Sequence, residues 1–145
     1  MHCLAVRFGG VVSVILSMVG EMQLRMKEKA VRDKSFRFAI RIVELTKYLE
    51  SKKREFVLSR QLLRSGTAIG ALVREAEHAE SKADFIHKMS IALKEANETS
   101  YWLELLQEGE YIDPVSFKSI GANSEELIKL LTAIVKTSKV AKRSD

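Results

Sequence analysis

A helical pattern of apolar residues runs from Phe36 to Ser138 and is interrupted only three times by short turns. The interruptions fall at Ser51–Arg54, at Glu80–Ser81 and at Gly109–Pro114. Helices joined by connections this short must run antiparallel to their neighbours. The sequence therefore predicts an all-α fold, an antiparallel up-down-up-down four-helix bundle.

The composition suits one small domain. The chain has 145 residues, enough to bury its own core. Its one proline and seven glycines are too few turn-forming residues for a β-rich fold. The single cysteine, Cys3, cannot form an internal disulfide. We therefore expect a reducing compartment and a cytoplasmic location.

The first residues hold the longest continuous apolar run, Val11–Val19. The run is too short to span a bilayer, so we expect no membrane association. A signal peptide is an open alternative, although no small-residue cleavage site follows the run. We expect residues 1–25 to be a disordered extension or an over-extended start, residues 26–140 to form the bundle, and residues 141–145 to be a basic tail.

The apolar residues predict which face of each helix is buried. The first helix, about Asp33–Glu50, should bury Phe36, Ala39, Ile40, Val43, Thr46 and Leu49, and the second, about Glu55–Ala79, should bury Leu58, Leu62, Ile69, Val73 and Ala76. In the second helix Gly66 and Gly70 lie four residues apart. Because each glycine costs a helix about 1 kcal/mol, we interpret the pair as a groove for close helix packing. A phosphate-binding loop is disfavoured, because no Gly-Lys-Ser/Thr follows.

The third helix carries a sustained heptad seam, made of Phe85, Met89, Ala92, Ala96, Thr99, Leu103 and Leu106. Ser81 and Asp84 have capping-box spacing at its start, and Gly109 is predicted as its C′ residue. Asp113 and Pro114 begin the fourth helix as N-cap and N1. Its buried face is predicted to hold Phe117, Ile120, Leu127, Leu131 and Ile134.

Basic residues gather in two stretches that the predicted topology brings to one end. Residues 1–60 contain thirteen Lys or Arg against six Asp or Glu, whereas residues 61–145 contain eleven against thirteen. The start of the first helix and the end of the fourth lie at the same pole of such a bundle. We name the set there the basic pole and predict that it binds nucleic acid: Lys27, Lys29, Arg32, Lys34, Arg37, Arg41, Lys136, Lys139, Lys142 and Arg143.

A polar stripe is predicted to lie close to the core where the second and third helices meet. It consists of Gln61, Arg64, Glu75, Glu95 and Glu98. Because the two helices are antiparallel, Arg64 should meet Glu95 or Glu98, and a buried charge needs such a partner. Further along the third helix, Tyr101, Trp102 and Leu105 extend apolar surface beyond the seam, which is typical of an interface between subunits.

Three segments together resemble a family of small bacterial four-helix proteins named for open reading frames in intervening sequences of some 23S ribosomal RNA genes. They read KSFRFAIRIVELTKYL, QLLRSGTAIGALVREA and SKADFIHKMSIALKEANETSYWLELL, and the resemblance covers roughly residues 26–139. In the second segment Gln61, Arg64 and Glu75 match the family pattern, whereas Ala68 and Leu72 replace a serine and an asparagine. The resemblance implies an up-down bundle and a homopentameric ring. A related protein is the nucleic-acid-binding accessory factor of diversity-generating retroelements.

No spacing in the sequence assembles a catalytic set, so we expect a non-enzymatic protein without cofactor, metal or small-molecule substrate. Glu75-x-x-His78 and Asp84-x-x-His87 resemble di-metal motifs, but His78 should point outward and lysines surround that pole. Two functions stay open. One is an oligomeric scaffold that binds RNA or DNA; the alternative is a structural or protein-interaction module with no nucleic-acid role.

Overall fold

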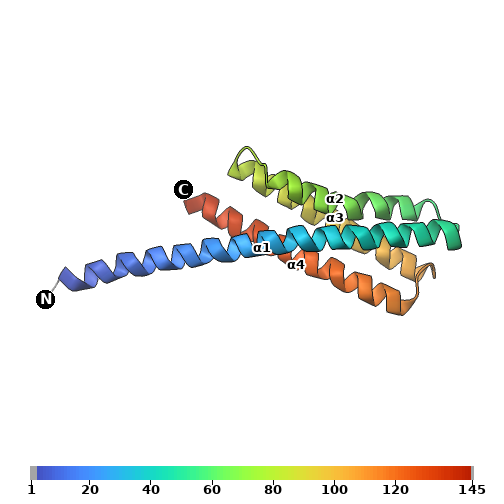
Figure 1. Ribbon diagram of the computed structural model, residues 1–145, viewed down its shortest axis with the longest axis horizontal. Coiled ribbons are helices and arrows are strands. Elements are labelled where there is room, and N and C mark those ends of the chain that lie inside the picture. The colour runs from blue at the N-terminus through green and yellow to red at the C-terminus, as the bar shows by residue number, and fades with distance from the viewer. Residues whose placement is uncertain (1–2, 145) are drawn as a thin grey trace.

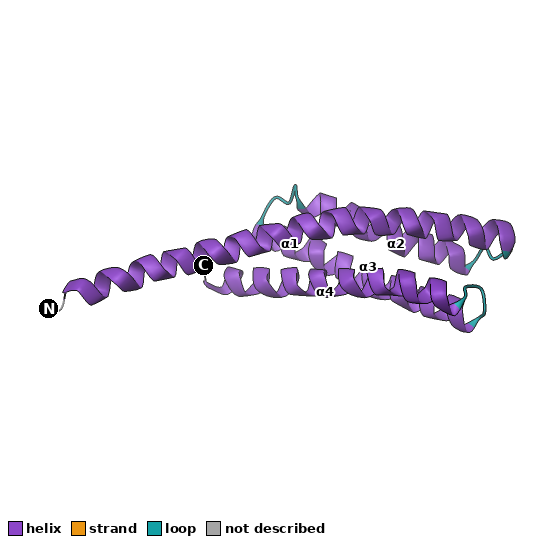
Figure 2. Ribbon diagram, turned by 60° about the horizontal axis from the view of Figure 1, so that its bottom comes forward, coloured by secondary structure: helices purple, strands orange, loops and turns teal. Residues whose placement is uncertain are grey.

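The computed structural model of the protein describes residues 3–144. It contains four helices, α1 Cys3–Lys52, α2 Leu58–Ala76, α3 Lys82–Glu108 and α4 Pro114–Ser144. α1 and α3 each pack against α2 and α4, while no contact joins the diagonal pairs within the described residues. Figure 1 shows the chain reversing its direction at each connection. In Figure 2 the loops of the described residues lie at these connections. The predicted all-α four-helix bundle is confirmed.

The first helix is much longer than predicted. We expected a start near Asp33, but α1 is continuous from Cys3 and projects past the other three helices (Figure 1). The apolar side chains of the projecting part are exposed, from Val11 to Met22. Leu24 is the first to pack against the core. The disorder expected for residues 1–25 is therefore replaced by helix over the described part, and the domain boundary at residue 26 stays a prediction.

The buried face of α1 differs from the predicted face. Phe36 and Ile40 are 52% and 45% exposed, so their assignment to the core is wrong. Phe38 and Ile42 are buried in their place, on a stripe that begins at Val31. Thr46 and Leu49, at the end of the helix, are buried as predicted.

Two glycines of α2 explain how α1 is seated. A Cβ atom added to Gly66 would lie 2.8 Å from Cγ1 and 2.9 Å from Cγ2 of Ile42, and both distances are too short for a contact between carbon atoms. A Cβ atom added to Gly70 would lie 3.5 Å from the Ser35 hydroxyl, an ordinary van der Waals distance. The interpretation of the glycine pair as a groove for close helix packing is therefore confirmed, and Gly66 is its tightest point.

The buried faces of α3 and α4 follow the predictions, except that Phe85 and Phe117 are only half-buried against the core. Met89, Ala92, Ala96, Thr99, Leu103 and Leu106 are buried along α3, and Ile120, Leu127, Leu131 and Ile134 along α4. Two pairs of hydroxyl groups, at adjacent residues of α3, connect this helix to α2 and to α4. Thr99 donates to the Ser65 hydroxyl of α2 at 3.0 Å, and the hydroxyls of Ser100 and Ser124 of α4 lie 2.9 Å apart.

The helix ends are held by side-chain caps. The Ser81 hydroxyl accepts the Asp84 N–H at 3.1 Å, and the Asp113 carboxylate accepts the Ser116 N–H at 2.9 Å, both as predicted. Gly109 is the C-cap residue of α3 rather than the predicted C′ residue. Glu110 takes that place with φ 62°, and the Tyr111 N–H closes the motif on the Leu106 carbonyl at 2.9 Å.

The second helix begins three residues later than the predicted Glu55, because Glu55 caps it instead. Its carboxylate accepts the N–H groups of Val57, Leu58 and Ser59 at 3.1, 2.9 and 2.7 Å. Burial alone would raise the pKa of Glu55, but these three donors hold it below its ordinary value. The cap therefore stabilises the fold at neutral pH and is lost as the pH falls through that lowered pKa.

Substitution of the two glycines by alanine should have opposite effects on stability. Gly66→Ala should destabilise the protein by about 1–2 kcal/mol, because the clash with Ile42 outweighs the gain in helix propensity. Gly70→Ala should stabilise it by up to about 1 kcal/mol, because its new methyl group meets only ordinary contacts. Urea unfolding of both variants measures the difference. Equal effects would contradict the proposed seating of α1, as would a Gly66→Ala cost that persists in an Ile42→Ala background.

Candidate nucleic-acid interface

The predicted basic pole consists of residues of α1 and α4. Both chain termini are at one end of the bundle (Figure 1), where residues 136–143 form the last turns of α4. The α1 stretch runs from this end into the bundle, since Lys34 pairs with Glu126 and Arg41 bonds to Ser119 and Asn123, near the start of α4. The fold therefore places Lys27 and Lys29 nearest to the basic end of α4 and Arg41 farthest from it.

Three of the ten cations are engaged inside the subunit. Lys34 forms an ion pair with Glu126 of α4 at 2.7 Å, and Arg32 with Glu77 of α2 at 3.4 Å. Arg41 donates to the Ser119 hydroxyl at 2.9 Å, to the Ser119 carbonyl at 3.3 Å and to the Asn123 side chain. These three side chains hold α1 against α4 and α2, which reduces the charge that they offer to a ligand.

The remaining cations have no hydrogen bond or ion pair with the described part of the chain. Lys27 is half-buried and the others are exposed, namely Lys29, Arg37, Lys136, Lys139, Lys142 and Arg143. Exposed and unpaired lysine and arginine side chains can contact phosphate without first breaking an internal bond. We call these seven residues the free cations of the basic pole.

Acidic residues gather on the α2 and α3 side of the same pole. Glu77 and Glu80 lie in the turn between α2 and α3, Glu75 lies in the last turn of α2, and Asp84 lies in the first turn of α3. Glu75 pairs with Lys88 at 2.8 Å, and Glu77 pairs with Arg32. The α2 and α3 side of the pole is therefore mixed in charge, and a positive α1 and α4 side stays a prediction.

The polar stripe forms the predicted pair but is not buried. Arg64 makes an ion pair with Glu98 and a second with Glu95 at 3.4 Å, while its side chain stays 52% exposed. Trp102 donates its indole N–H to the same Glu98 carboxylate at 3.0 Å. The hydrogen bonds from Arg64 and Trp102 lower the pKa of Glu98. Gln61 is exposed, and Glu75 pairs with Lys88 instead of joining the stripe.

Two apolar patches lie on helices at diagonal corners of the bundle. On α3, Tyr101 and Leu105 are 53% and 36% exposed, and the Tyr101 ring meets the Trp102 ring edge-on at 5.0 Å. On α1, the exposed patch is Phe36 and Ile40, with the Arg74 guanidinium 5.2 Å from the Phe36 ring centre. The α3 patch is predicted from the sequence, whereas the α1 patch is not, because the helical pattern assigns Phe36 and Ile40 to the core.

Other kinds of site find little support in the described residues. None of the described helices combines the length and the apolarity needed to cross a membrane. His78 and His87 are exposed, and in the part of the chain that the structure describes no group of three or more histidine, cysteine or carboxylate side chains could hold a metal ion.

Arg64→Ala should destabilise the protein by less than about 1 kcal/mol at neutral pH, since the pair is exposed to solvent. A buried pair would have cost about 3 kcal/mol or more. Because the pKa of Glu98 is lowered, the contribution of the pair is present above the ordinary glutamate pKa and is lost as the pH falls through the lowered value. Chemical unfolding of both proteins at about pH 7 and about pH 2 tests this. A cost that persists in acid would mean that Arg64 acts through packing.

Comparison with known proteins agrees with this architecture. The profile of the 23S rRNA-intervening sequence protein family matches residues 27–133. A crystal structure of a protein of unknown function from the S23 ribosomal protein family of Bacteroides thetaiotaomicron is 58% identical and superposes with a TM-score of 0.75, covering 76% of this chain and 98% of that one. Among curated proteins, none matches the chain. The family match leaves residues 1–26 outside it and includes most of the bundle, so the chain belongs to the 23S rRNA-intervening sequence protein family.

Proposed function

We propose that the protein is a non-enzymatic, cytoplasmic, oligomeric helical bundle that binds RNA or DNA through the free cations of the basic pole. The observation that carries the proposal is a set of seven lysine and arginine side chains, in the middle of α1 and in the last turns of α4, without a partner in the described part of the chain. Cations in this state neutralise phosphates and release counterions from the nucleic acid. The net charge of +5 favours the same encounter.

Binding of this kind should depend little on base sequence. Phosphate contacts position a protein on nucleic acid, whereas base edges carry the sequence information. Six of the seven free cations are exposed side chains on helix surfaces, Lys27 is half-buried, and no recognition motif accompanies them. The ligand class is therefore nucleic acid in general.

The two apolar patches favour a ring of subunits. A two-fold dimer brings identical patches together, whereas a closed ring joins two different patches of neighbouring subunits. Phe36 and Ile40 lie on α1 and Tyr101 and Leu105 on α3, and these helices occupy diagonal corners. This arrangement supports a homo-oligomer, and the family resemblance makes a homopentamer our proposal. A ring would repeat the basic pole around its axis, so that weak contacts add up.

Neutralising the α4 cations should weaken binding to RNA and DNA alike. The variant replaces Lys136, Lys139, Lys142 and Arg143 by glutamine. We expect a lower affinity at each salt concentration and a log-affinity against log-salt slope that is shallower by roughly 0.7–0.9 for each lost phosphate contact. Fluorescence anisotropy with one labelled RNA and one labelled DNA probe at several salt concentrations measures both quantities.

A matched control exists at the opposite pole. Lys47, Lys52, Lys53 and Arg54 are also exposed, and their replacement by glutamine removes the same charge. The control variant should bind as the parent does. An equal loss in both variants would assign the affinity to overall charge, and a parent that binds neither probe at low salt would contradict the proposal.

Assembly can be tested by charging each patch separately. Ile40→Glu and Tyr101→Glu should each reduce the parent oligomer, expected at five times the 16.4 kDa subunit mass, to a monomer in light scattering. In a ring, a mixture of the two variants retains one intact pair of patches and should give a heterodimer. The exposed Val115 provides the control, because Val115→Glu should leave the mass unchanged. A monomeric parent, or a mixture that stays monomeric, would contradict the ring.

The alternative is a structural or protein-interaction module with no nucleic-acid role. The exposed aromatic residues Phe36 and Tyr101 favour it, since aromatic side chains are enriched where proteins meet. An oligomer that fails to bind either probe at low salt would select this alternative.

A further inference from the structure

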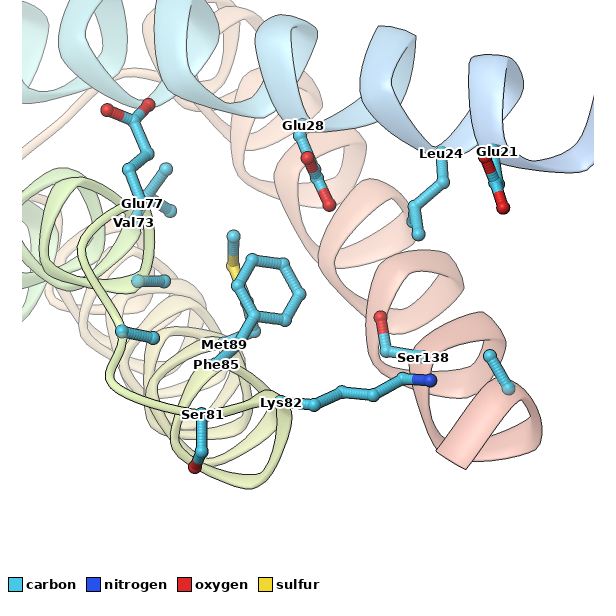
Figure 3. Close-up of a pocket in the computed structure, with 13 residues that line it drawn as sticks. Glu21, Leu24, Glu28, Val73, Glu77, Ser81, Lys82, Phe85, Met89 and Ser138 are labelled. Carbon is cyan, nitrogen blue, oxygen red and sulfur yellow. The ribbon is translucent and has the colours of Figure 1, made fainter. Parts of the chain in front are cut away.

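A cavity of about 530 Å³ lies at the pole that holds the chain termini, between all four helices. It is present because α1 continues past the ends of the other helices, so that Glu21, Leu24 and Glu28 form one wall. Figure 3 shows the opposite walls, with Phe85 and Met89 of α3 and Ser138 of α4. The volume falls within the range of roughly 300–1,000 Å³ that is typical of small-molecule sites.

The floor of the cavity is apolar. Leu24, Val73, Phe85 and Met89 line it, and the Phe85 ring stands at its centre in Figure 3. Val73 and Met89 are each only 1% exposed, so this floor is part of the rigid core. An aromatic or aliphatic ligand body would gain favourable contact here.

The rim of the cavity is acidic although the pole around it is basic. Glu21 and Glu28 come from α1, and Glu77, at the end of α2, is already paired with Arg32. Among the described residues that line the cavity, Lys82 is the one lysine or arginine. Figure 3 shows the Glu28 carboxylate directed towards the interior. Burial and the nearby Glu77 raise the pKa of Glu28, and Arg25 only partly opposes them. A positively charged ligand group would relieve the cost of burying the Glu28 carboxylate.

The Ser138 hydroxyl supplies a second, independent indication. Ser138 is 3% exposed, and its buried Oγ atom has no hydrogen-bond partner among the residues that the structure describes. Such an atom is costly in a folded protein and commonly marks a place that a ligand or water completes. In Figure 3 the hydroxyl points from α4 into the space below α1, across from Glu28. A donor group placed between the two would satisfy both side chains.

From these observations we propose that the cavity binds a small primary amine with an apolar body. The ammonium group carries three donors and no acceptor, which suits the Glu28 carboxylate and the Ser138 hydroxyl oxygen. The apolar body would lie against Phe85 and Met89. The cavity lies within the basic pole, beside Lys27, Lys29 and Lys139, but the proposal uses none of the free cations and does not depend on nucleic-acid binding.

Isothermal titration with matched probes tests the proposal on the full chain. Benzylamine should bind, benzyl alcohol should bind more weakly, and benzoate should not bind. Glu28→Gln should weaken benzylamine roughly tenfold or more while leaving benzyl alcohol unchanged, because only the charge-assisted bond is lost. Ser138→Ala should weaken benzylamine by a smaller factor. Glu44→Gln, an exposed carboxylate of the same helix, is the control and should have no effect.

The same ammonium chemistry is present in a lysine side chain, and a further probe separates the sources. Hexylamine should bind better than Nα-acetyl-lysine methylamide, whose polar backbone would not enter the apolar floor. Tighter binding of the blocked lysine would overturn the proposal in favour of a protein partner. Equal affinity of benzylamine for parent and Glu28→Gln, or binding of benzoate at least as tight as that of benzylamine, would also overturn it.

Discussion

The contact between Ile42 of α1 and Gly66 of α2 fixes the rotation of α1 about its own axis. With Ile42 seated on the glycine, Phe38 turns into the core and Phe36 and Ile40 turn to the surface. The same rotation directs Lys34 and Arg41 towards α4, where each finds a partner. The apolar patch of α1, and the division of the basic pole into engaged and free cations, both depend on this one approach.

The parts of the fold that could be predicted are those with a single narrow apolar stripe. The seam of α3 leaves only one face to bury, and the caps at Ser81 and Asp113 are read from short local patterns. In α1, apolar residues occupy more than half of the circumference, so two overlapping stripes fit the helical period equally well. Only the partner surface on α2 decides between them, and that information is not local.

The same distinction applies to the candidate site. The pairing of Arg64 with Glu95 and Glu98 followed from the antiparallel arrangement of two consecutive helices, but its exposure did not, because the stripe lies at the edge of the α2–α3 contact. The partners of Lys34 and Arg41 depend on the register of α1 against α4, which are the first and last elements. The cavity could not be foreseen either, since it requires α1 to extend beyond its neighbours.

The extension of α1 gives one continuous helix two different stabilities. From Val31 to Leu49 the helix is packed on both neighbours, so its amide hydrogens exchange with solvent deuterium only when the bundle opens. From Gly9 to Gly20 the side chains are exposed, and the backbone is held by the helix–coil balance alone. Gly9 and Gly10 at one end of this segment and Gly20 at the other make that balance unfavourable. This segment should therefore unwind without unfolding of the bundle. The cavity wall at Glu21–Glu28 lies between the exposed part of α1 and its packed part.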